Sequence, residues 1–328
     1  MIDYLFNRVA LVLNKTQKKA RQEILKNIKN NVYQFEEVNC LSCLCDDLDL
    51  FIKHDMYGLK QNLALCKKCG LLFVKKQLTD SSLDLFYNSL YRKLDRGKEN
   101  AQEDFYRLQY IKGENIFNYV ERHIQDNSGQ ILEIGCGSGG ILGFFRDKGY
   151  SVKGTDIGRE YLEYGKNKYG LDLSTDTIDD IRNYKNKNSI TFSVIILEQV
   201  LEHFKNPREV LRQIRGIIDK NTLIYIGVPG LRNIEDHYRS NFHYYLQFPH
   251  LVYFELNTLK YMLNQEGFYF LDGNEEIESV FRKADDLMNI KVTNYKEVKK
   301  YIKFLSIDFK IKRCKYIFQA ILKRIFKK

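Results

Sequence analysis

The sequence predicts a protein of the α/β class, built on a mostly parallel sheet of seven strands that ends in an antiparallel hairpin. Three observations predict this fold. From residue 130 onward, short runs rich in Val, Ile and Leu alternate with helical patterns, as in a parallel sheet with crossover helices. A glycine-rich loop follows the first of these runs. Two cysteine pairs precede it, which indicates a small module ahead of the sheet.

The composition is that of a globular protein with a sizeable core. The chain has 328 residues, of which 44% are hydrophobic and only three are proline. Its uncharged apolar runs are much shorter than the roughly 20 residues that a membrane-spanning helix needs. The start of the chain is a poor signal peptide, because Asp3 and Arg8 accompany its short apolar stretch. We therefore expect a cytoplasmic protein.

The net charge of +10 is concentrated at one end of the chain. Residues 296–328 contain 12 basic and two acidic residues, so the rest of the chain is neutral overall. A nucleic-acid binder would carry basic character on the body of the protein. The charge distribution therefore predicts no nucleic-acid partner.

The first 79 residues divide into a helical segment over 1–36 and a cysteine-paired module over 37–79. In the module, two C-x2-C pairs separated by 22 residues match the spacing of a zinc ribbon, in which four thiolates hold one structural zinc ion. The predicted ligands are Cys40, Cys43, Cys66 and Cys69. An odd total of seven cysteines argues against a disulfide framework.

Residues 80–292 are predicted to hold the sheet domain and the helices that lead into it. The helical pattern before the sheet ends at Asn127-Ser128-Gly129. The predicted strands are Gln130–Ile134, Ser151–Thr155, Leu171–Ser174, Thr191–Leu197 and Thr222–Gly227, and the hairpin is formed by Phe268–Asp272 and Glu276–Arg282. The predicted helices are Gly140–Lys148, Arg159–Tyr169, Thr177–Asn183, Pro207–Ile218 and Thr258–Glu266.

The glycine loop predicts a nucleoside cofactor. Its residues Gly135, Cys136, Gly137, Ser138, Gly139 and Gly140 fit both G-x-G-x-x-G and G-x-G-x-G. Glycines let the backbone approach a ligand closely, and Asp156, at the end of the next strand, is the acid expected to bind ribose hydroxyls. Glu133 separates the possible cofactors. A carboxylate at that strand end would repel a pyrophosphate but suits a cofactor with an ammonium group.

The stretch Leu-Glu-Ile-Gly-Cys-Gly-Ser-Gly over 132–139 resembles motif I of the class I S-adenosylmethionine-dependent methyltransferases, whose domain is Rossmann-like. Residues 154–157, 197–203 and 228–230 resemble later parts of that family, whereas Ser193 stands where the family usually has Asp. The resemblance covers roughly residues 130–282. It implies that S-adenosylmethionine is held by Glu133, Gly135, Cys136, Gly137, Gly139, Asp156 and Ile157, with Thr177 along the adenine and Glu198 at the methionine end.

A narrower resemblance concerns the order of the segments. A cysteine-paired module, then Phe86-Tyr87 and Tyr91-Arg92, then this domain is similar to bacterial methyltransferases of sugar and cell-surface polysaccharide pathways. The resemblance implies a sugar or glycan substrate. The candidate substrate contacts are Tyr87, Tyr91 and His243.

Methylation of a sugar hydroxyl needs a base to take its proton. We predict His250 for this role, because it follows the fifth strand in a segment that overhangs the carboxyl ends of the sheet, and His203 as the second catalytic candidate. Related sugar C-methyltransferases carry a functional His at the position that His250 resembles, preceded by Glu where this chain has Pro249. That departure favours O-methylation and leaves C-methylation as the alternative.

Two further expectations complete the sequence-based picture. A nicotinamide-dependent sugar oxidoreductase could use the same glycine loop, although both Tyr-x3-Lys pairs, Tyr164 with Lys168 and Tyr295 with Lys299, are poorly placed for it. Residues 293–328 predict a basic amphipathic helix, whose apolar residues include Cys314, Ile317, Phe318, Ile321, Leu322 and Ile325. Such a helix suits peripheral contact with an anionic membrane at its cytoplasmic face, or packing on the domain or a partner.

Overall fold

The computed structural model describes residues 11–98, 101–285 and 294–325, with side chains up to residue 315. At its centre is a sheet of seven strands in the order β12-β13-β10-β9-β6-β7-β8. The parallel strands are β6 (Gln130–Ile134), β7 (Val152–Thr155), β8 (Leu173–Ser174), β9 (Phe192–Glu198) and β10 (Leu223–Gly227). β13 (Glu278–Lys283) pairs antiparallel with both β10 and β12 (Phe268–Gly273). The predicted α/β fold with a mostly parallel sheet of seven strands is confirmed.

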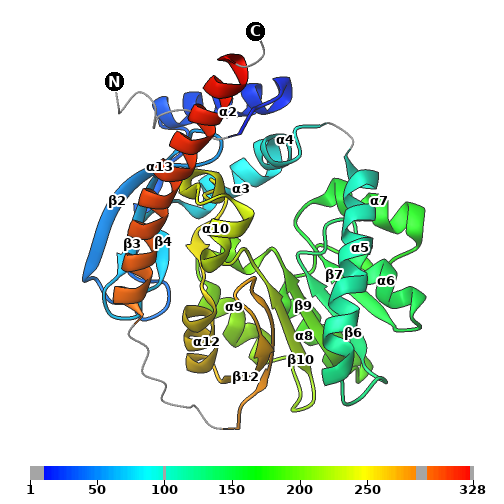
Figure 1. The fold of residues 1–328 in the computed structure, drawn as a ribbon. Helices are drawn as coiled ribbons and strands as arrows, with labels where there is room; N and C mark the ends of the chain where they lie inside the picture. The colour runs from blue at the N-terminus through cyan, green and yellow to red at the C-terminus, as the bar shows by residue number, and fades with distance from the viewer. Residues whose placement is uncertain (1–10, 99–100, 286–293, 326–328) are drawn as a thin grey trace.

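Helices cover both faces of this sheet (Figure 1). On one face lie α5 (Gln102–Val120), α6 (Gly140–Asp147) and α7 (Arg159–Tyr169), whose buried residues Phe117, Phe145 and Leu162 pack with Ile131 and Val194 of the sheet. On the other face lie α8 (Ile178–Asn188), α9 (Pro207–Arg215) and α12 (Leu256–Gln265), packed on Leu132 and Ile195. The strand order reverses beside β6, and ligands bind such sheets at the carboxyl ends of the strands around this point.

Local sequence signals explain where the helices begin. The Asn206 side chain accepts a hydrogen bond from the Glu209 N–H at the start of α9, and Pro207 occupies the first turn. α8 begins with a capping box between Thr177 and Asp180. The helix ends differ from the prediction: α8 continues to Asn188 instead of ending at Asn183, and α9 ends at Arg215, three residues short of Ile218.

The cysteine-paired module is joined to the sheet domain by a strand that the sequence did not predict. β2 (Leu48–His54), β3 (Lys60–Cys66) and β4 (Leu72–Val74) form an antiparallel sheet, and β11 (Val252–Tyr253), which follows β10 in the chain, pairs with β4. The short strands β1 (Phe35–Glu37) and β5 (Lys76–Leu78) pair beside it. The segment that carries His250 is thereby attached to the N-terminal module.

Helical segments connect the module to the sheet domain. α2 (Lys15–Lys29) packs with α4 (Arg92–Asp95), and α3 (Asp80–Phe86) continues into a π-helical turn, η1 (Tyr87–Tyr91). π-Turns often occur at functional sites, and this one carries both candidate tyrosines. The start of the predicted N-terminal helical segment, residues 1–10, lies outside the described residues. The remaining short elements are η2 (Glu121–His123), η3 (Leu201–His203), η4 (Leu231–Asn233), α10 (Ile234–His237) and α11 (Phe242–Tyr245).

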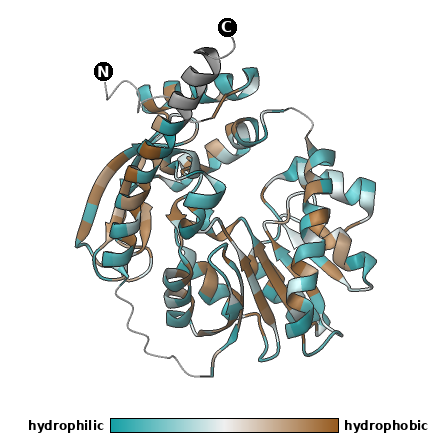
Figure 2. Cartoon of the chain, viewed as in Figure 1, coloured by the Kyte–Doolittle hydropathy of each residue, from teal (hydrophilic) through white to brown (hydrophobic). Residues whose placement is uncertain are grey.

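The last helix, α13 (Tyr295–Ile325), crosses the N-terminal module and buries Val298 and Leu305 against it. Figure 2 shows apolar and polar residues interleaved along its described part. Phe304, Ile307 and Ile311 are exposed on α13. Of the apolar residues predicted for this helix, Cys314 is exposed and the others lie outside the described side chains. Within the described ranges, no helix has the length and apolar character needed to cross a membrane.

Candidate active site

The glycine loop lies between β6 and α6 in a conformation that requires glycine. Gly135, Gly137 and Gly139 have φ angles of +80°, +53° and +76°, values that other residues rarely adopt. A Cβ atom at Gly137 would lie 2.4 Å from Cε1 of Phe105. Cys136 is fully buried, and a Cβ at Gly154 of the neighbouring strand would lie 2.7 Å from its sulfur. The Cys136 side chain therefore belongs to the core.

Asp156 holds this loop from the end of β7. Its carboxylate accepts hydrogen bonds from the backbone N–H of Gly137, at 2.8 Å, and of Gly158, at 2.6 Å. Ile157, the next residue, is 65% exposed. An exposed apolar side chain next to an acid matches the two faces of a nucleoside, the flat base and the ribose hydroxyls.

Glu133 is a buried carboxyl group without a partner. The residue is 1% exposed, and neither of its oxygens has a hydrogen-bond partner among the described residues. Burial raises its pKa well above the usual value, and the nearby Glu198 and Asp156 carboxylates raise it further. Leaving such a group unpaired is costly, and a cation at the loop would satisfy it. These residues fit the ammonium-bearing nucleoside cofactor that the sequence predicted.

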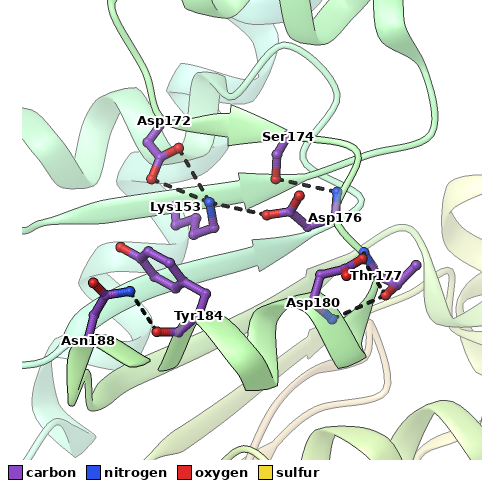
Figure 3. A network of polar contacts seen from close by, with 8 residues as sticks. All are labelled: Lys153, Asp172, Ser174, Asp176, Thr177, Asp180, Tyr184 and Asn188. Atoms are coloured by element: carbon purple, nitrogen blue, oxygen red, sulfur yellow. Dashed lines mark hydrogen bonds and ion pairs between the residues drawn. The ribbon is translucent and has the colours of Figure 1, made fainter. Parts of the chain in front are cut away.

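The segment after β8 is ordered by a polar network, shown in Figure 3. The Thr177 hydroxyl accepts from the Asp180 N–H and donates to the Asp180 carboxylate, so it caps α8. Lys153, which is 5% exposed, lies 3.4 Å from both the Asp172 and the Asp176 carboxylates. Thr177 therefore has a structural task beside the predicted adenine contact, and Lys153 anchors the strand ends that shape the segment.

Glu198 ends β9 and pairs with a lysine that the sequence did not indicate. Its Oε1 lies 3.5 Å from Lys112 Nζ, and Lys112 also binds Glu278 at 2.6 Å. The other carboxyl oxygen of Glu198, Oε2, is buried without a hydrogen-bond partner among the described residues, and burial raises the pKa of Glu198. These side chains line a cavity of about 130 Å³ with Gly227, Val228 and His237. Glu198 thus lies between the end of β9 and a small cavity whose lining does not include the glycine loop, so its place at the cofactor stays a prediction.

A second cluster brings together residues from three distant parts of the chain. The ring centroids of His203 and His250 lie 4.8 Å apart, with the rings nearly perpendicular. The Nε2 atom of each lies 3.9 Å from Oε1 of Glu202. The Tyr87 hydroxyl, from η1, lies 2.9 Å from Nδ1 of His203. The structure therefore assembles both candidate bases with one candidate tyrosine.

Two groups lie within hydrogen-bond distance of Nδ1 of His203: the Tyr87 hydroxyl, which can donate or accept, and the carbonyl oxygen of Pro249, which can only accept. The Pro249 carbonyl favours the tautomer with the proton on Nδ1, in which Nε2 presents a lone pair toward Glu202. Burial lowers the pKa of His203 to about 4 and that of His250 well below its usual value. Because their pKa values are lowered, both imidazoles are neutral at neutral pH. Burial also raises the pKa of Glu202 to about 8.

Two candidate substrate residues occupy different positions. The Tyr91 ring lies 4.8 Å from the Tyr87 ring and 5.9 Å from the His203 ring, so it borders the cluster. His243 does not join it, because its Nδ1 lies 2.7 Å from the His54 carbonyl oxygen, on β2. This contact between α11 and the N-terminal module points to a structural role for His243.

The four cysteines of the two C-x2-C pairs meet in one place. The sulfurs of Cys40 and Cys69 lie 3.5 Å apart, as do those of Cys43 and Cys66, and all four ligand atoms lie within 4.8 Å of one another. Four thiols in a group of this size suit a tetrahedral zinc ion. Cys45 is outside the group.

Among the cofactors that a glycine loop on a parallel sheet can hold, one with an ammonium group, such as S-adenosylmethionine, would satisfy the unpaired Glu133 carboxyl group. A family model described as "Methyltransferase domain" matches residues 107–272, about half of the chain. The chain therefore belongs to the methyltransferase-domain family, which confirms the class of enzyme predicted from the sequence.

Curated relatives are similar over part of this domain. The ubiquinone biosynthesis O-methyltransferase of Haemophilus ducreyi is 26% identical over 117 residues, which are 34% of this chain and 50% of that protein. The protein of the same name from Rickettsia typhi is 26% identical over 145 residues, 42% of this chain and 57% of that protein. The chain thus spans about half the length of the curated relatives it matches.

Solved structures of methyltransferases are also similar. The plantazolicin methyltransferase BpumL in complex with SAH is 18% identical, with a TM-score of 0.44 over 60% of this chain and 79% of that one. Magnesium protoporphyrin IX methyltransferase from Synechocystis with bound SAH is 12% identical, with a TM-score of 0.44 over 63% of this chain and 100% of that one.

Sequence reasoning missed two residues of the site, Glu202 and Lys112. Glu202 is the acid between the two candidate bases, and it lies in the Leu-Glu-His run that had drawn attention to His203. An acid next to a candidate histidine was the available signal. No local signal marked Lys112, because a lysine on an amphipathic helix is usually exposed.

Proposed function

We propose that this enzyme transfers the methyl group of S-adenosylmethionine to the oxygen of a sugar hydroxyl, in a nucleotide-sugar or a surface glycan. The observation that carries the proposal is the pair of neutral imidazoles whose Nε2 atoms face Glu202, just beyond the end of β9. A hydroxyl group becomes a competent nucleophile only when a base removes its proton during the reaction. Two unprotonated ring nitrogens in a site that excludes water are suited to that task.

Each residue of the cluster has a separate role in the proposed reaction. His250 accepts the hydroxyl proton on Nε2, and the carboxyl group of Glu202 lies 3.9 Å from that nitrogen. The Pro249 carbonyl and Tyr87 orient His203. His203 is the second candidate for the group that accepts the hydroxyl proton. Tyr91 borders the space for the sugar. Because methyl transfer is an in-line displacement, fixing the two reactants supplies much of the rate.

The cofactor would be held by the groups at the carboxyl ends of β6, β7 and β9. When bound, it supplies a methyl group on a positively charged sulfur. Glu133 provides the carboxylate for its ammonium group, Asp156 the acceptor for its ribose hydroxyls and Ile157 an apolar surface for its base. Glu198 lies at the methionine end.

Oxygen is favoured as the acceptor atom by two observations. Pro249 replaces the Glu of the related sugar C-methyltransferases, and the curated relatives are named as O-methyltransferases. The sugar class rests on the resemblance of the whole segment order to sugar and polysaccharide methyltransferases. A panel of nucleotide-sugars and lipid-linked glycans, assayed with labelled S-adenosylmethionine, tests both points. Label on a sugar oxygen supports the proposal, and label on carbon or only on non-sugar phenols contradicts it.

Two accessory features belong to the same proposal. Cys40, Cys43, Cys66 and Cys69 hold one structural zinc ion, which leaves no open position for chemistry. The basic helix α13 brings the enzyme to the cytoplasmic face of an anionic membrane, where glycans on lipid carriers are assembled.

A further inference from the structure

Glu202, His203 and His250 form a set of metal-ligand atoms apart from the cysteines. Their side chains come from η3 and from the segment ahead of β11, which lie 46 residues or more apart in sequence. One ligand atom from each lies within 4.8 Å of the other two. Both Nε2 atoms lie 3.9 Å from the same oxygen, Oε1 of Glu202. The three donors therefore converge on one small volume.

The carboxyl group of Glu202 lacks any compensating partner. The residue is 1% exposed, and neither oxygen has a hydrogen-bond partner among the described residues. A separation of 3.9 Å is too long for a hydrogen bond to either histidine. It leaves space for an ion bound at about 2.0–2.2 Å from each donor after a small inward rotation of the side chains. An ion would thus satisfy a buried group that the protein leaves unpaired.

The surroundings of His203 resemble those of a metal-ligating histidine. A ligating imidazole usually donates its other N–H to a carbonyl or carboxylate, which fixes the tautomer and the ring orientation. In this structure the Pro249 carbonyl, 3.1 Å from Nδ1, performs that task, and Tyr87 reinforces it at 2.9 Å. Two imidazoles and one carboxylate are the donors of open zinc and non-haem iron sites, and imidazole disfavours Mg²⁺ and Ca²⁺.

We propose that Glu202, His203 and His250 bind a divalent first-row transition-metal ion, and that its binding inhibits methyl transfer. The ion takes up the Nε2 lone pairs that would otherwise accept the hydroxyl proton, so this inhibitory role rests on the proposed function. The binding site itself rests only on the three donors. The enzyme would therefore respond to free zinc through its active site, independently of the zinc at the cysteines.

Cobalt titration of the full-length protein, with zinc already bound at the cysteines, tests the site. We expect one further equivalent of Co²⁺, with the visible absorption of nitrogen and oxygen ligation and without sulfur-to-cobalt charge transfer. His250→Ala and the isosteric Glu202→Gln should each weaken it by about 10-fold or more, since even an outer-shell partner is worth that much. His123→Ala, at a histidine whose side chain lies beside Asp272 and away from the three donors, is the matched control and should leave cobalt binding unchanged. Circular dichroism checks that each variant folds.

The outcomes separate the two proposals. Absence of the second equivalent, or its persistence in both variants, overturns the metal site. Inhibition of turnover by Zn²⁺ over the range in which cobalt binds, reversed by a chelator, supports the inhibitory role. If cobalt binds without any loss of turnover, the inhibitory role of the metal and the assignment of the base are both wrong. The metal-binding site itself is then still supported. If the enzyme methylates no sugar, the absorption titration still decides whether the metal binds.

Discussion

The carboxylate of Asp156 accepts a hydrogen bond from the backbone N–H of Gly137, and this 2.8 Å contact ties the end of β7 to the glycine loop. The acid predicted to bind ribose therefore also holds the backbone that borders the cofactor. Loop order and cofactor binding depend on the same side chain, and the structure leads to five predictions about the site and its supports.

Asp156→Asn should weaken the binding of S-adenosylhomocysteine by about 10- to 100-fold, since a hydrogen bond to a charged group is worth about 1.5–3 kcal/mol. Isothermal titration calorimetry measures this loss, and Asp172→Asn, in the network with Lys153, is the matched control. A parallel titration with NAD should show no tight binding. Tight binding of NAD alone would contradict the cofactor assignment and favour the oxidoreductase.

Cofactor binding should release a proton from Glu133. Because burial raises its pKa, the carboxyl group is protonated in the free protein at pH values below that pKa, and pairing with an ammonium group favours the ionised form. Affinity should therefore rise with pH and level off above the raised pKa. Calorimetry in two buffers of different ionisation enthalpy detects the released proton.

Glu133→Gln is the matched variant for this proton linkage. It should abolish the release and weaken binding, whereas Glu114→Gln, on the exposed side of α5, should do neither. Equal proton release by Glu133→Gln and the unaltered protein would show that another group titrates.

The cysteine cluster should contain about one zinc ion per chain. Cys66→Ser should lose the metal and lower the melting temperature, with little effect on cofactor affinity, because Cys66 ends β3 in the N-terminal module whereas the predicted cofactor residues lie on the sheet domain. Elemental analysis and thermal unfolding measure both effects. Cys45→Ser, just outside the group, should retain the zinc, and a metal-free protein of full stability would refute the assignment.

His250→Ala should leave affinity for S-adenosylhomocysteine nearly unchanged and lower turnover by about 10²–10⁴-fold, the usual contribution of acid–base catalysis. Steady-state kinetics with an identified acceptor measure the loss, with His123→Ala, beside Asp272 and outside the site, as the control. If turnover is unchanged, the base is His203. His243, bonded to the module through the His54 carbonyl, should affect stability instead.

Full-length protein should sediment with vesicles that contain anionic lipid and be released by salt, whereas a chain ending at Thr293 should not bind. Removing α13 also uncovers the apolar residues against which Val298 and Leu305 pack, among them Leu63 on β3, so a gentler change is needed. Replacing Ile307 and Ile311 together by Ser should weaken vesicle binding without loss of folding. Leu50→Ser, at a similarly exposed apolar position on β2, is the control. Vesicle binding that is unaffected by the removal of α13 and by the replacement of Ile307 and Ile311 would contradict membrane contact through α13.

Several parts of the molecule were predictable because their signals are local. The parallel strands were predictable from apolar runs that alternate with helical patterns, and the glycine loop from residues that tolerate positive φ, whereas the order of the strands in the sheet was not predicted. Glu133 was predicted as a cofactor residue from its distance of two residues to the first glycine, and the structure shows it buried without a hydrogen-bond partner among the described residues. The spacing of the cysteine pairs indicated four residues that the fold brings together.

Other features depend on contacts between distant segments. Tyr87 and His203 are 116 residues apart, yet their side chains lie 2.9 Å apart, and β11 joins the N-terminal module at β4 although 178 residues separate Phe73 from Val252. Periodicity and spacing report the environment of a residue within a few turns of chain, so they predicted which residues lie near the carboxyl ends of the strands. The packing of the N-terminal module on the sheet domain decided which of these residues meet. It also placed Glu202 between two histidines, because the burial and orientation of a side chain depend on the surfaces of both parts at once.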